Sequence, residues 1–378
     1  MSFTSLGLSP ALIKAMASQN YNQPFPIQRE AIPAILNKKD ILGIAKTGSG
    51  KTASYVLPIL NNLQGNTTTK NRHVNVLVLV PTRELAIQIE HVFRQFAAGL
   101  TERIKILAVY GGVSINPQMM NLQGVNILIA TTGRLLELAE SNAVHLSGID
   151  TLVLDEADKM LNLGFKEEMT RIFALLPRKR QNLLFSATLS DDLDAIKQIL
   201  LHDPLIIKIE SKEDTIDLIN QSAYYVAESK KGPLLRYLIN QNELKQVLVF
   251  TSSIFKADAV VDKLVKNGID AMAIHGKKSQ SARTDALHRF KTNKIQVLVA
   301  TDLLSRGIDI EYLPYVINYE LPRSPKDYIH RIGRTGRAEI SGEAISFVSA
   351  ADQAHFKIIQ KKMGKPITMI DSTNLDLR

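Results

Sequence analysis

The strongest constraint on the fold is a repeated alternation of short apolar segments with longer amphipathic ones. The apolar segments are rich in β-branched residues, and between them lie stretches such as 84–96 and 166–176 with the spacing of an amphipathic helix. The apolar segments are residues 41–45, 76–80, 104–109, 125–130, 151–154 and 182–185. This alternation predicts a parallel sheet that is covered by helices on both faces.

The alternation stops once and then begins again. Segment 205–209 is followed by a polar stretch, and further strand-like segments come after it at 246–250, 271–274, 295–300, 315–319 and 343–349. We therefore predict an α/β chain of two tandem domains, with a possible cleft between them. The predicted boundaries are a first domain at 1–208, a linker at 209–217, a second domain at 218–364 and a short, loosely held tail at 365–378.

Length and composition support this division and exclude several classes of protein. A chain of 378 residues is too long for one ordinary core, and its 45% hydrophobic and 22% charged residues are typical of globular proteins. No apolar run approaches the roughly 18 residues of a membrane helix, and the first residues lack the layout of a signal peptide. The absence of cysteine excludes disulfides, a thiolate nucleophile and a cysteine zinc site. We expect a cytoplasmic protein without a membrane partner.

The formal net charge of +9 indicates a polyanionic partner. Lysine and arginine side chains near a phosphate backbone release counterions, which makes binding favourable and sensitive to salt. A positive charge that serves solubility alone is the alternative explanation.

The most specific motif is a phosphate-binding loop at residues 45–52. It follows a predicted strand and precedes a predicted helix, which is the context that such a loop requires. The glycines let backbone N–H groups face the phosphates, Lys51 would reach the β- and γ-phosphates, and Thr52 would hold Mg²⁺. The predicted nucleotide contacts of this loop are Ala45, Lys46, Thr47, Gly48, Ser49, Gly50, Lys51 and Thr52.

An acidic partner for this loop follows the apolar segment 152–154. Asp155 would lie at the carboxyl edge of the sheet, where open α/β sheets bind ligands, and would hold Mg²⁺ directly or through water. Glu156 would polarise the attacking water. A cluster of acids at the end of a strand is more often a solvated loop, but its position about a hundred residues after a phosphate-binding loop favours the catalytic interpretation.

Residues 155–158 read Asp-Glu-Ala-Asp, and the chain resembles the DEAD-box RNA helicases almost from end to end. The resemblance implies two RecA-like domains, each a parallel sheet flanked by helices, with ATP between them and RNA across both. Hydrolysis would then require the two domains to close. The first ten residues, and the small number of residues outside the two predicted domains, are similar to the bacterial RhlE-like branch of the family.

The resemblance extends to the adenine site and to a coupling motif in the first domain. It implies that Gln28 reads the adenine edge and that an aromatic residue, Phe3 or Tyr21, packs on the base. From the sequence alone, both aromatic residues are more often core residues. Ser186 and Thr188 match a motif that couples hydrolysis to strand separation, and their hydroxyls could hydrogen-bond the acids at 155–158. The alternative is a helix N-cap before Leu189.

The second domain would complete the ATP site. Segment 330–337 matches the family's arginine motif, with Arg334 and Arg337 as the predicted arginine fingers and His330 as a link to the first domain. An arginine cluster without this spacing would more often face solvent or nucleic acid. Segment 300–309 matches a further motif, which implies Asp309 near the ribose and Arg306 near the γ-phosphate.

The remaining matches predict an RNA surface that contacts mainly phosphate and sugar, so that binding is largely independent of sequence. Thr132 stands where the family usually has proline, and we expect a less rigid turn there. RNA rather than DNA rests on the resemblance alone. The predicted RNA contacts are Pro81, Thr82, Arg83, Gly111, Gly112, Thr131, Gly133, Arg134, Gln280, Arg283 and Thr301.

These observations predict a monomeric ATP-dependent RNA helicase that uses ATP and Mg²⁺ and locally separates duplexes or remodels RNA–protein complexes. An ATP-gated RNA clamp without productive unwinding carries the same motifs and is the main alternative. A phosphotransferase for small molecules and a DNA translocase are the other two.

Overall fold

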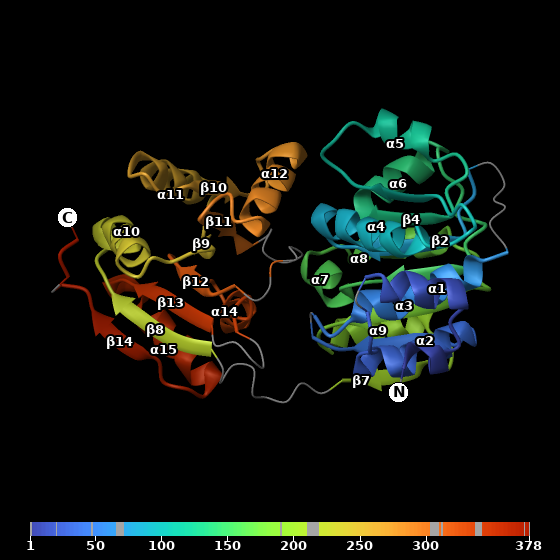
Figure 1. Ribbon diagram of the computed structural model, residues 1–378, viewed down its shortest axis with the longest axis horizontal. Coiled ribbons are helices and arrows are strands. Elements are labelled where there is room, and N and C mark those ends of the chain that lie inside the picture. Colours follow the sequence, from blue (N-terminus) through green and yellow to red (C-terminus); the bar gives the residue numbers. More distant parts are fainter. Residues whose placement is uncertain are drawn as a thin grey trace. The chain divides into compact units, whose positions relative to one another are not determined.

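A computed structural model describes residues 2–19, 21–46, 48–65, 72–189, 191–209, 219–302, 310, 313–336, 342–373 and 375–377. The chain divides into two compact units, Met1–Ser211 and Lys212–Arg378. Each unit is built on a seven-stranded sheet whose neighbouring strands all pair in parallel (Figure 1). The prediction of two domains with parallel sheets flanked by helices is confirmed.

The sheet of the first unit has the order β3-β4-β2-β5-β6-β1-β7. Its central strands are continuous apolar runs because both of their faces are buried. The strands are β1 (Ile41–Ile44), β2 (Val76–Val80), β3 (Ile106–Val109), β4 (Ile127–Thr131), β5 (Thr151–Leu154), β6 (Gln181–Ser186) and β7 (Leu205–Lys208).

Helices cover both faces of this sheet (Figure 1). α1 to α4 pack into one apolar cluster, and α6 to α9 pack into a second cluster on the opposite face. The helices are η1 (Phe3–Leu6), α1 (Pro10–Ala17), α2 (Pro26–Leu36), α3 (Lys51–Leu63), α4 (Arg83–Ala97), α5 (Ile115–Asn121), α6 (Thr132–Glu140), α7 (Ala157–Asn162), α8 (Lys166–Ala174) and α9 (Asp191–Leu200).

The second unit repeats this topology with the order β10-β11-β9-β12-β13-β8-β14. Reading both orders from the same end, β12 takes the place of β5, β13 that of β6, β8 that of β1 and β14 that of β7. The strands are β8 (Ile219–Tyr225), β9 (Val247–Thr251), β10 (Ala271–Ile274), β11 (Val297–Thr301), β12 (Tyr315–Asn318), β13 (Gly342–Val348) and β14 (Thr368–Asp371).

The helices of the second unit also pack on both faces of their sheet. α10 and α11 contribute to one apolar cluster, whereas α12 and the pair α14 and α15 contribute to two others. The helices are η3 (Glu228–Lys230), α10 (Lys231–Gln241), α11 (Ile254–Lys266), α12 (Gln280–Lys291), α14 (Pro325–Ile332), η4 (Ala350–Asp352) and α15 (Gln353–Met363).

Two strands of the second unit were not predicted, and one of them contradicts the expected loose tail. β8 was missed because only Ile219 and Ala223 of its seven residues are buried, so its sequence carries no apolar run. β14 lies inside the tail expected at 365–378, yet it pairs in parallel with β8, and Leu375 and Leu377 pack on the core. The tail prediction was wrong because pairing with β8 is a tertiary contact. Most of the predicted linker, 210–217, lies outside the described residues.

Because all strands of a sheet are parallel, the loops that follow them gather at one edge. In the first unit this carboxyl edge carries the loops after β1, β2, β3, β4, β5 and β6, which hold every first-domain motif except the Phe3–Gln28 segment. Among the helices in the described part of the chain, none combines the length and apolar character needed to cross a membrane.

Truncation after Lys365 should destabilise the second unit. It removes β14 and the buried side chain of Ile367, whose burial alone is worth about 2 kcal/mol. We expect the thermal unfolding midpoint of this unit to fall by several degrees. Met369→Thr, at an exposed position of the same strand, is the control and should have little effect. An unchanged unfolding midpoint after truncation would support the original expectation of a loosely held tail.

Candidate functional site

The predicted phosphate-binding loop joins β1 to α3, and its backbone has the expected shape. Gly48 and Gly50 have φ angles of +76° and +88°, in the left-handed region that other residues disfavour. A Cβ atom at Gly50 would lie 2.5 Å from Nε2 of Gln28, so this position also lacks room for a side chain. α3 begins at the next residue, so the unpaired N–H groups of its first turn are directed at the loop. Thr47 lies outside the described residues.

Lys51 is the first residue of α3, and its side chain is buried within the loop. Its Nζ donates a hydrogen bond to the carbonyl of Ala45. Burial lowers the pKa of the Lys51 ammonium, while the carboxylates of Asp155 and Glu156 act in the opposite direction. The ammonium therefore lies near the acids of β5 and points back into the loop.

Asp155 follows β5 at the carboxyl edge and is only 2% exposed. Its Oδ2 accepts a hydrogen bond from the Tyr55 hydroxyl at 2.8 Å, and its Oδ1 accepts one from the backbone N–H of Glu156 at 2.9 Å. Burial, and to a lesser extent the neighbouring Glu156, raise the pKa of Asp155 to about 6, while Lys51 acts against both. The ionised carboxylate is thus costly here and would be stabilised by a further cation.

Glu156 has a strained backbone and an unused oxygen. Its φ and ψ of 56° and 45° are unusual for a residue other than glycine. One carboxylate oxygen pairs with Lys159 Nζ at 2.6 Å, but the other is buried without a hydrogen-bond partner, as is Oδ1 of Asp158. Backbone strain and unsatisfied buried acceptors both cost stability, and both are concentrated where proteins perform chemistry.

Tyr55 is a residue of this site that the sequence did not reveal. Its hydroxyl donates a hydrogen bond to Asp155 and lies near the side chain of Thr52, so it lies close to both predicted Mg²⁺ ligands. Its ring packs against Phe185, with centroids 5.3 Å apart. The only signal in the sequence was helical spacing, since Tyr55 lies one turn after Lys51 on α3.

Ser186 and Thr188 lie at the end of β6, and one of their hydroxyls reaches the acids. Thr188 Oγ1 donates to Oδ2 of Asp158 at 3.0 Å. The Ser186 hydroxyl instead donates to the carbonyl of Thr188 at 2.7 Å. The hydrogen bonds predicted to Asp155–Asp158 are therefore made by Thr188 alone. α9 begins at Asp191, so neither residue is its N-cap.

Gln28 connects the predicted adenine site to the phosphate-binding loop. It is fully buried, accepts a hydrogen bond from Phe25 N–H at 2.9 Å and donates one to the Gly50 carbonyl at 3.0 Å. Phe3 is a core residue, whereas Tyr21 is partly buried and meets Phe96 edge to face at 5.2 Å. Phe25, which the sequence did not single out, lies beside Gly50 with 47% of its surface exposed.

On the other side of the same edge, the loops after β2 and β3 come together. Pro81 precedes Thr82, which caps α4 by accepting a hydrogen bond from Leu85 N–H at 3.3 Å. The guanidinium of Arg83 covers the backbone of Gly112, where a Cβ atom would lie 2.1 Å from Arg83 Nη1. Gly112 also has a φ of +75°, so its backbone conformation favours glycine, whereas the flexible Arg83 side chain could move to make room.

Two buried polar side chains hold the Gly111–Gly112 loop in place. Gln118 accepts a hydrogen bond from Tyr110 N–H at 3.0 Å and donates one back to the Tyr110 carbonyl at 3.1 Å. Arg134 donates to the Val113 carbonyl and to Glu137, each at 2.8 Å, and its Nη1 is buried without a hydrogen-bond partner. Gln118 was not predicted, because a glutamine in a short helix carries no motif.

The turn that departs from the family pattern has a simple geometry. Thr131 ends β4, and Thr132 is the first residue of α6, followed by Gly133. Proline is favoured at the first position of a helix because its missing N–H is not needed there. Thr132 is buried and takes this position, but it lacks the fixed φ of proline. This difference is the reason why we expect a less rigid turn.

In the second unit, Gln280 begins α12 and Arg283 lies one turn further along, so both are on one side of the helix. Ser279 caps this helix by accepting a hydrogen bond from Ala282 N–H at 3.2 Å. Thr301 ends β11, the strand that joins the sheet beside β10, and all three predicted RNA contacts are buried side chains.

Arg331 forms a buried network of hydrogen bonds that was not predicted from the sequence. It is 1% exposed and donates to both oxygens of Asp302, at 2.5 and 2.7 Å. It also donates to Asn318 Oδ1 at 3.1 Å and to the Glu320 carbonyl at 2.6 Å, and it lies over the Phe250 ring. This arginine therefore connects α14 to the ends of β11 and β12.

The predicted arginine fingers lie just beyond α14. Arg334 is 9% exposed; its N–H donates to the Arg331 carbonyl, and its own carbonyl accepts from Leu313 N–H at 3.0 Å. His330 lies in the last turn of α14. The other predicted residues of this part of the site, Arg306, Asp309 and Arg337, lie outside the described residues.

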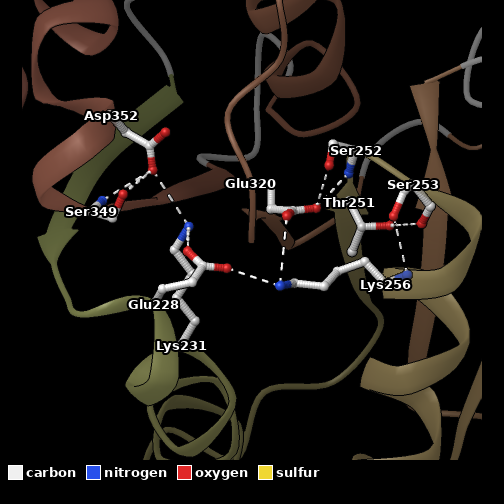
Figure 2. A network of polar contacts seen from close by, with 9 residues as sticks. All are labelled: Glu228, Lys231, Thr251, Ser252, Ser253, Lys256, Glu320, Ser349 and Asp352. Atoms are coloured by element: carbon white, nitrogen blue, oxygen red, sulfur yellow. Dashed lines mark hydrogen bonds and ion pairs between the residues drawn. The ribbon is translucent and has the colours of Figure 1, made fainter.

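The carboxyl edge of the second unit carries a network of ion pairs where the first unit has its phosphate-binding loop (Figure 2). β8 takes the place of β1, and the helix after it begins with Lys231, as α3 begins with Lys51. Lys231 is 2% exposed and pairs with Glu228 at 2.7 Å and with Asp352 at 3.5 Å. Its charge is thus compensated by carboxylates of the same unit.

The same network continues across the edge to β9 and β12 (Figure 2). Lys256 pairs with Glu228 at 2.9 Å, and Glu320 accepts hydrogen bonds from the Ser252 N–H and hydroxyl, each at 2.7 Å. Glu320 follows β12, the counterpart of β5, and so takes a place similar to that of the acids after β5. The lysines of this network are thus paired within the unit, whereas the acids of the first unit keep buried oxygens without hydrogen-bond partners.

Comparisons with known proteins agree with this geometry. The DEAD/DEAH box helicase family matches residues 25–196, and the helicase conserved C-terminal domain matches residues 230–339. The ATP-dependent RNA helicase CshA of Limosilactobacillus reuteri is 38% identical over 362 residues, which are 96% of this chain and 72% of the relative. The DEAD-box ATP-dependent RNA helicase CshA of Bacillus cereus is 38% identical over 375 residues, which are 99% of this chain and 70% of the relative.

Two solved structures are similar over nearly the whole chain. Dbp5 of S. cerevisiae, bound to RNA and ADP BeF3, is 28% identical with a TM-score of 0.84, over 99% of this chain and 97% of that one. A DEAD box protein from the hyperthermophile Methanococcus jannaschii is 35% identical with a TM-score of 0.54, over 98% of this chain and 99% of that one.

Fold and site together define a nucleotide-hydrolysing helicase with two RecA-like units. The chain belongs to the DEAD-box family of ATP-dependent RNA helicases, as the resemblance in the sequence implied. It therefore uses ATP. The narrower assignment to the RhlE-like branch is not confirmed by relatives named CshA and stays a prediction.

Asp155→Asn should stabilise the nucleotide-free protein at neutral pH. The folded pKa of about 6 lies above the unfolded value of 3.8, so the Asp155 contribution to stability is present below pH 4 and lost as pH rises through 6. Asparagine avoids this loss, and we expect a gain of up to about 3 kcal/mol at pH 8 that disappears near pH 4.

Chemical denaturation across this pH range measures the difference. Asp194→Asn, at a largely exposed position, is the control and should show no such pH-dependent gain. A variant Asp155→Asn that is less stable than the wild type at pH 8 would contradict the assigned electrostatics.

Proposed function

We propose that ATP binds at the carboxyl edge of the first unit, with its phosphates in the loop between β1 and α3. The observation that carries this proposal is the buried Lys51 ammonium, held within a glycine-shaped loop beside the acids that follow β5. A phosphate would replace the Ala45 carbonyl as the partner of Lys51, and Gln28, already joined to Gly50, would read the adenine edge. The exposed ring of Phe25 and the partly buried ring of Tyr21 are available to pack on the base.

The same edge fits Mg²⁺ as a partner of the nucleotide. Asp155 and Thr52 would hold the ion, and the buried oxygens of Glu156 and Asp158 that lack partners show a surplus of acceptors beside it. Mg²⁺ typically takes only one or two carboxylates together with phosphates and water. This agrees with the finding that the described residues contain no group of three or more His, Asp or Glu side chains arranged for a metal. The ion would neutralise charge on the phosphates.

Glu156 is proposed to hold and polarise the attacking water. Its backbone lies in the left-handed region, and one oxygen of its carboxylate is buried without a hydrogen-bond partner. The ion pair with Lys159 fixes the other oxygen at 2.6 Å, so the carboxylate has a defined orientation. A positioned acceptor of this kind is what hydrolysis requires.

The second unit is proposed to supply the positive charge that the reaction lacks. Arg334 and Arg337 would stabilise the transferred phosphoryl group, which in other P-loop enzymes accelerates hydrolysis by about three to five orders of magnitude. His330 would link the units, with Asp309 at the ribose and Arg306 near the γ-phosphate. Because these groups belong to a different unit from Lys51, ATP and RNA must bring the units together before hydrolysis is fast.

RNA is proposed to bind along the carboxyl edges through its backbone. In the first unit, Arg83 and the buried Nη1 of Arg134 are cationic groups beside the Gly111–Gly112 loop. In the second unit, Gln280, Arg283 and Thr301 lie on neighbouring elements. Contacts of this type position a strand without reading its bases. The similar Dbp5 structure holds RNA and ADP BeF3, which supports the pair of ligands proposed here.

The steady-state ATPase rate with and without an unstructured RNA, repeated with DNA of the same sequence, tests this function. We expect RNA to stimulate hydrolysis strongly and DNA to have little effect. The reason is that binding of RNA would bring the two units together and so place the arginines of the second unit at the ATP site. Equal rates without nucleic acid, with RNA and with DNA would overturn the closure mechanism. Strand displacement on a short RNA duplex then separates unwinding from clamping.

Two substitutions test the roles of the loop and the acids. Glu156→Gln keeps the shape of the side chain but replaces one acceptor oxygen by a donor and removes the charge. We therefore expect ATP binding to persist while RNA-stimulated hydrolysis slows by at least about a hundredfold. Lys51→Ala should abolish nucleotide-dependent activity. Fluorescent nucleotide binding and phosphate release measure the two effects. Loss of ATP binding in Glu156→Gln would show that Glu156 has a structural role instead of a catalytic one. Near-normal hydrolysis in Lys51→Ala would contradict the assignment of residues 45–52 as a phosphate-binding loop.

A further inference from the structure

Phe255 is the most exposed large hydrophobic side chain in the described part of the chain. It is 86% exposed and is the second residue of α11, which follows β9 at the carboxyl edge of the second unit. The core face of this helix is supplied instead by Ala257, Val260 and Leu264, so Phe255 contributes nothing to the packing of α11. A single exposed apolar side chain is common on protein surfaces, so the interpretation of Phe255 depends on the residues near it.

The structure places this ring beside the predicted RNA contacts of the second unit. Asp258, one helical turn after Phe255 and on the same side of α11, pairs with His275 Nε2 at 3.0 Å and with Lys278 Nζ at 2.9 Å. His275 and Lys278 belong to the loop that leads from β10 directly into Gln280 and α12. The ring therefore lies on the side of α11 that is joined to the loop carrying Gln280.

The charges around Phe255 favour a nucleic acid over an apolar protein surface. Its neighbour Lys256 and the loop residues Lys277 and Lys278 carry ammonium groups on this part of the unit. Lys256 pairs with Glu228 and Lys278 pairs with Asp258, but the two lysine side chains are still 34% and 37% exposed. An apolar partner would have to desolvate these charges, whereas RNA offers a phosphate for the cations and a base for the ring. Stacking of a base on an aromatic side chain is tolerant of sequence, which agrees with backbone-directed binding.

We propose that Phe255 stacks on a base of the RNA strand whose backbone is bound by Gln280 and Arg283. The proposal rests on the RNA-binding function proposed above and adds to it a single base contact on the second unit. By holding one base out of the regular stack, the ring would oppose the continuation of a duplex at this point. The low aromatic content of the chain, 6%, agrees with one isolated stacking residue rather than a platform.

The chain contains no tryptophan, so Phe255→Trp creates a single fluorescent reporter at this position. In the full-length variant, with ADP beryllium fluoride and magnesium, we expect an unstructured oligouridine RNA to quench the tryptophan emission. The matched control is Val265→Trp, at an exposed position near the end of the same helix, whose emission should not change.

An oligomer with the same ribose-phosphate backbone but without bases separates stacking from domain closure. It should leave the Phe255→Trp emission unquenched; equal quenching by this oligomer would overturn the proposal. Wild-type ATPase assays with oligouridine are run alongside. If the wild type shows no stimulation, the proposed function fails; if it is stimulated while the reporter stays silent, only the stacking proposal fails, and a protein partner becomes the better explanation for Phe255.

Phe255→Ala provides the affinity measurement. Loss of one stacked aromatic residue should raise the RNA concentration for half-maximal ATPase stimulation by at least about fivefold. Val265→Ala is the control and should leave this concentration unchanged. An unchanged value in Phe255→Ala would overturn the proposal even if the tryptophan reporter responded.

Discussion

Parallel pairing of the strands is the constraint on which the rest of this structure depends. Because every strand of a sheet points the same way, loops far apart in the sequence meet at one edge. Lys51 and Asp155 are separated by a hundred residues, yet both lie at the carboxyl edge of neighbouring parts of one sheet. No local property of either segment places them together; the register of β1, β6 and β5 does so.

The carboxyl edges of the two units differ in how their charged side chains are paired. In the first unit, burial raises the pKa of Asp155 to about 6 and leaves carboxylate oxygens unused, so the site carries an electrostatic cost that a cation would relieve. In the second unit, Lys231 is paired with Glu228 and Asp352, so its buried charge is compensated within the unit. One topology thus carries the proposed ligand site where buried acceptors are left without partners, and a set of ion pairs where charges are matched.

Buried polar side chains, rather than the motif residues alone, hold the loops in shape. Gln28 joins α2 to the phosphate-binding loop, Gln118 holds the turn after β3, and Arg331 joins the ends of β11 and β12 to α14. Each satisfies backbone groups that irregular loops leave unpaired, and each would be costly to remove. They explain how glycine-containing loops can be both accessible and well positioned.

The sequence by itself determined the fold class, the two-unit organisation and the family, because apolar periodicity and the spacing around Gly50 and Asp155 are local signals. Tertiary structure alone decided which polar groups meet. β14 and β8 become strands only by pairing with each other and with β13, and Tyr55 joins the site only through its contact with Asp155. The division between Thr188, which reaches Asp158, and Ser186, which does not, depends on side-chain geometry at the end of β6. Such contacts join residues that no sequence period connects, so they appear only once the strands are in register.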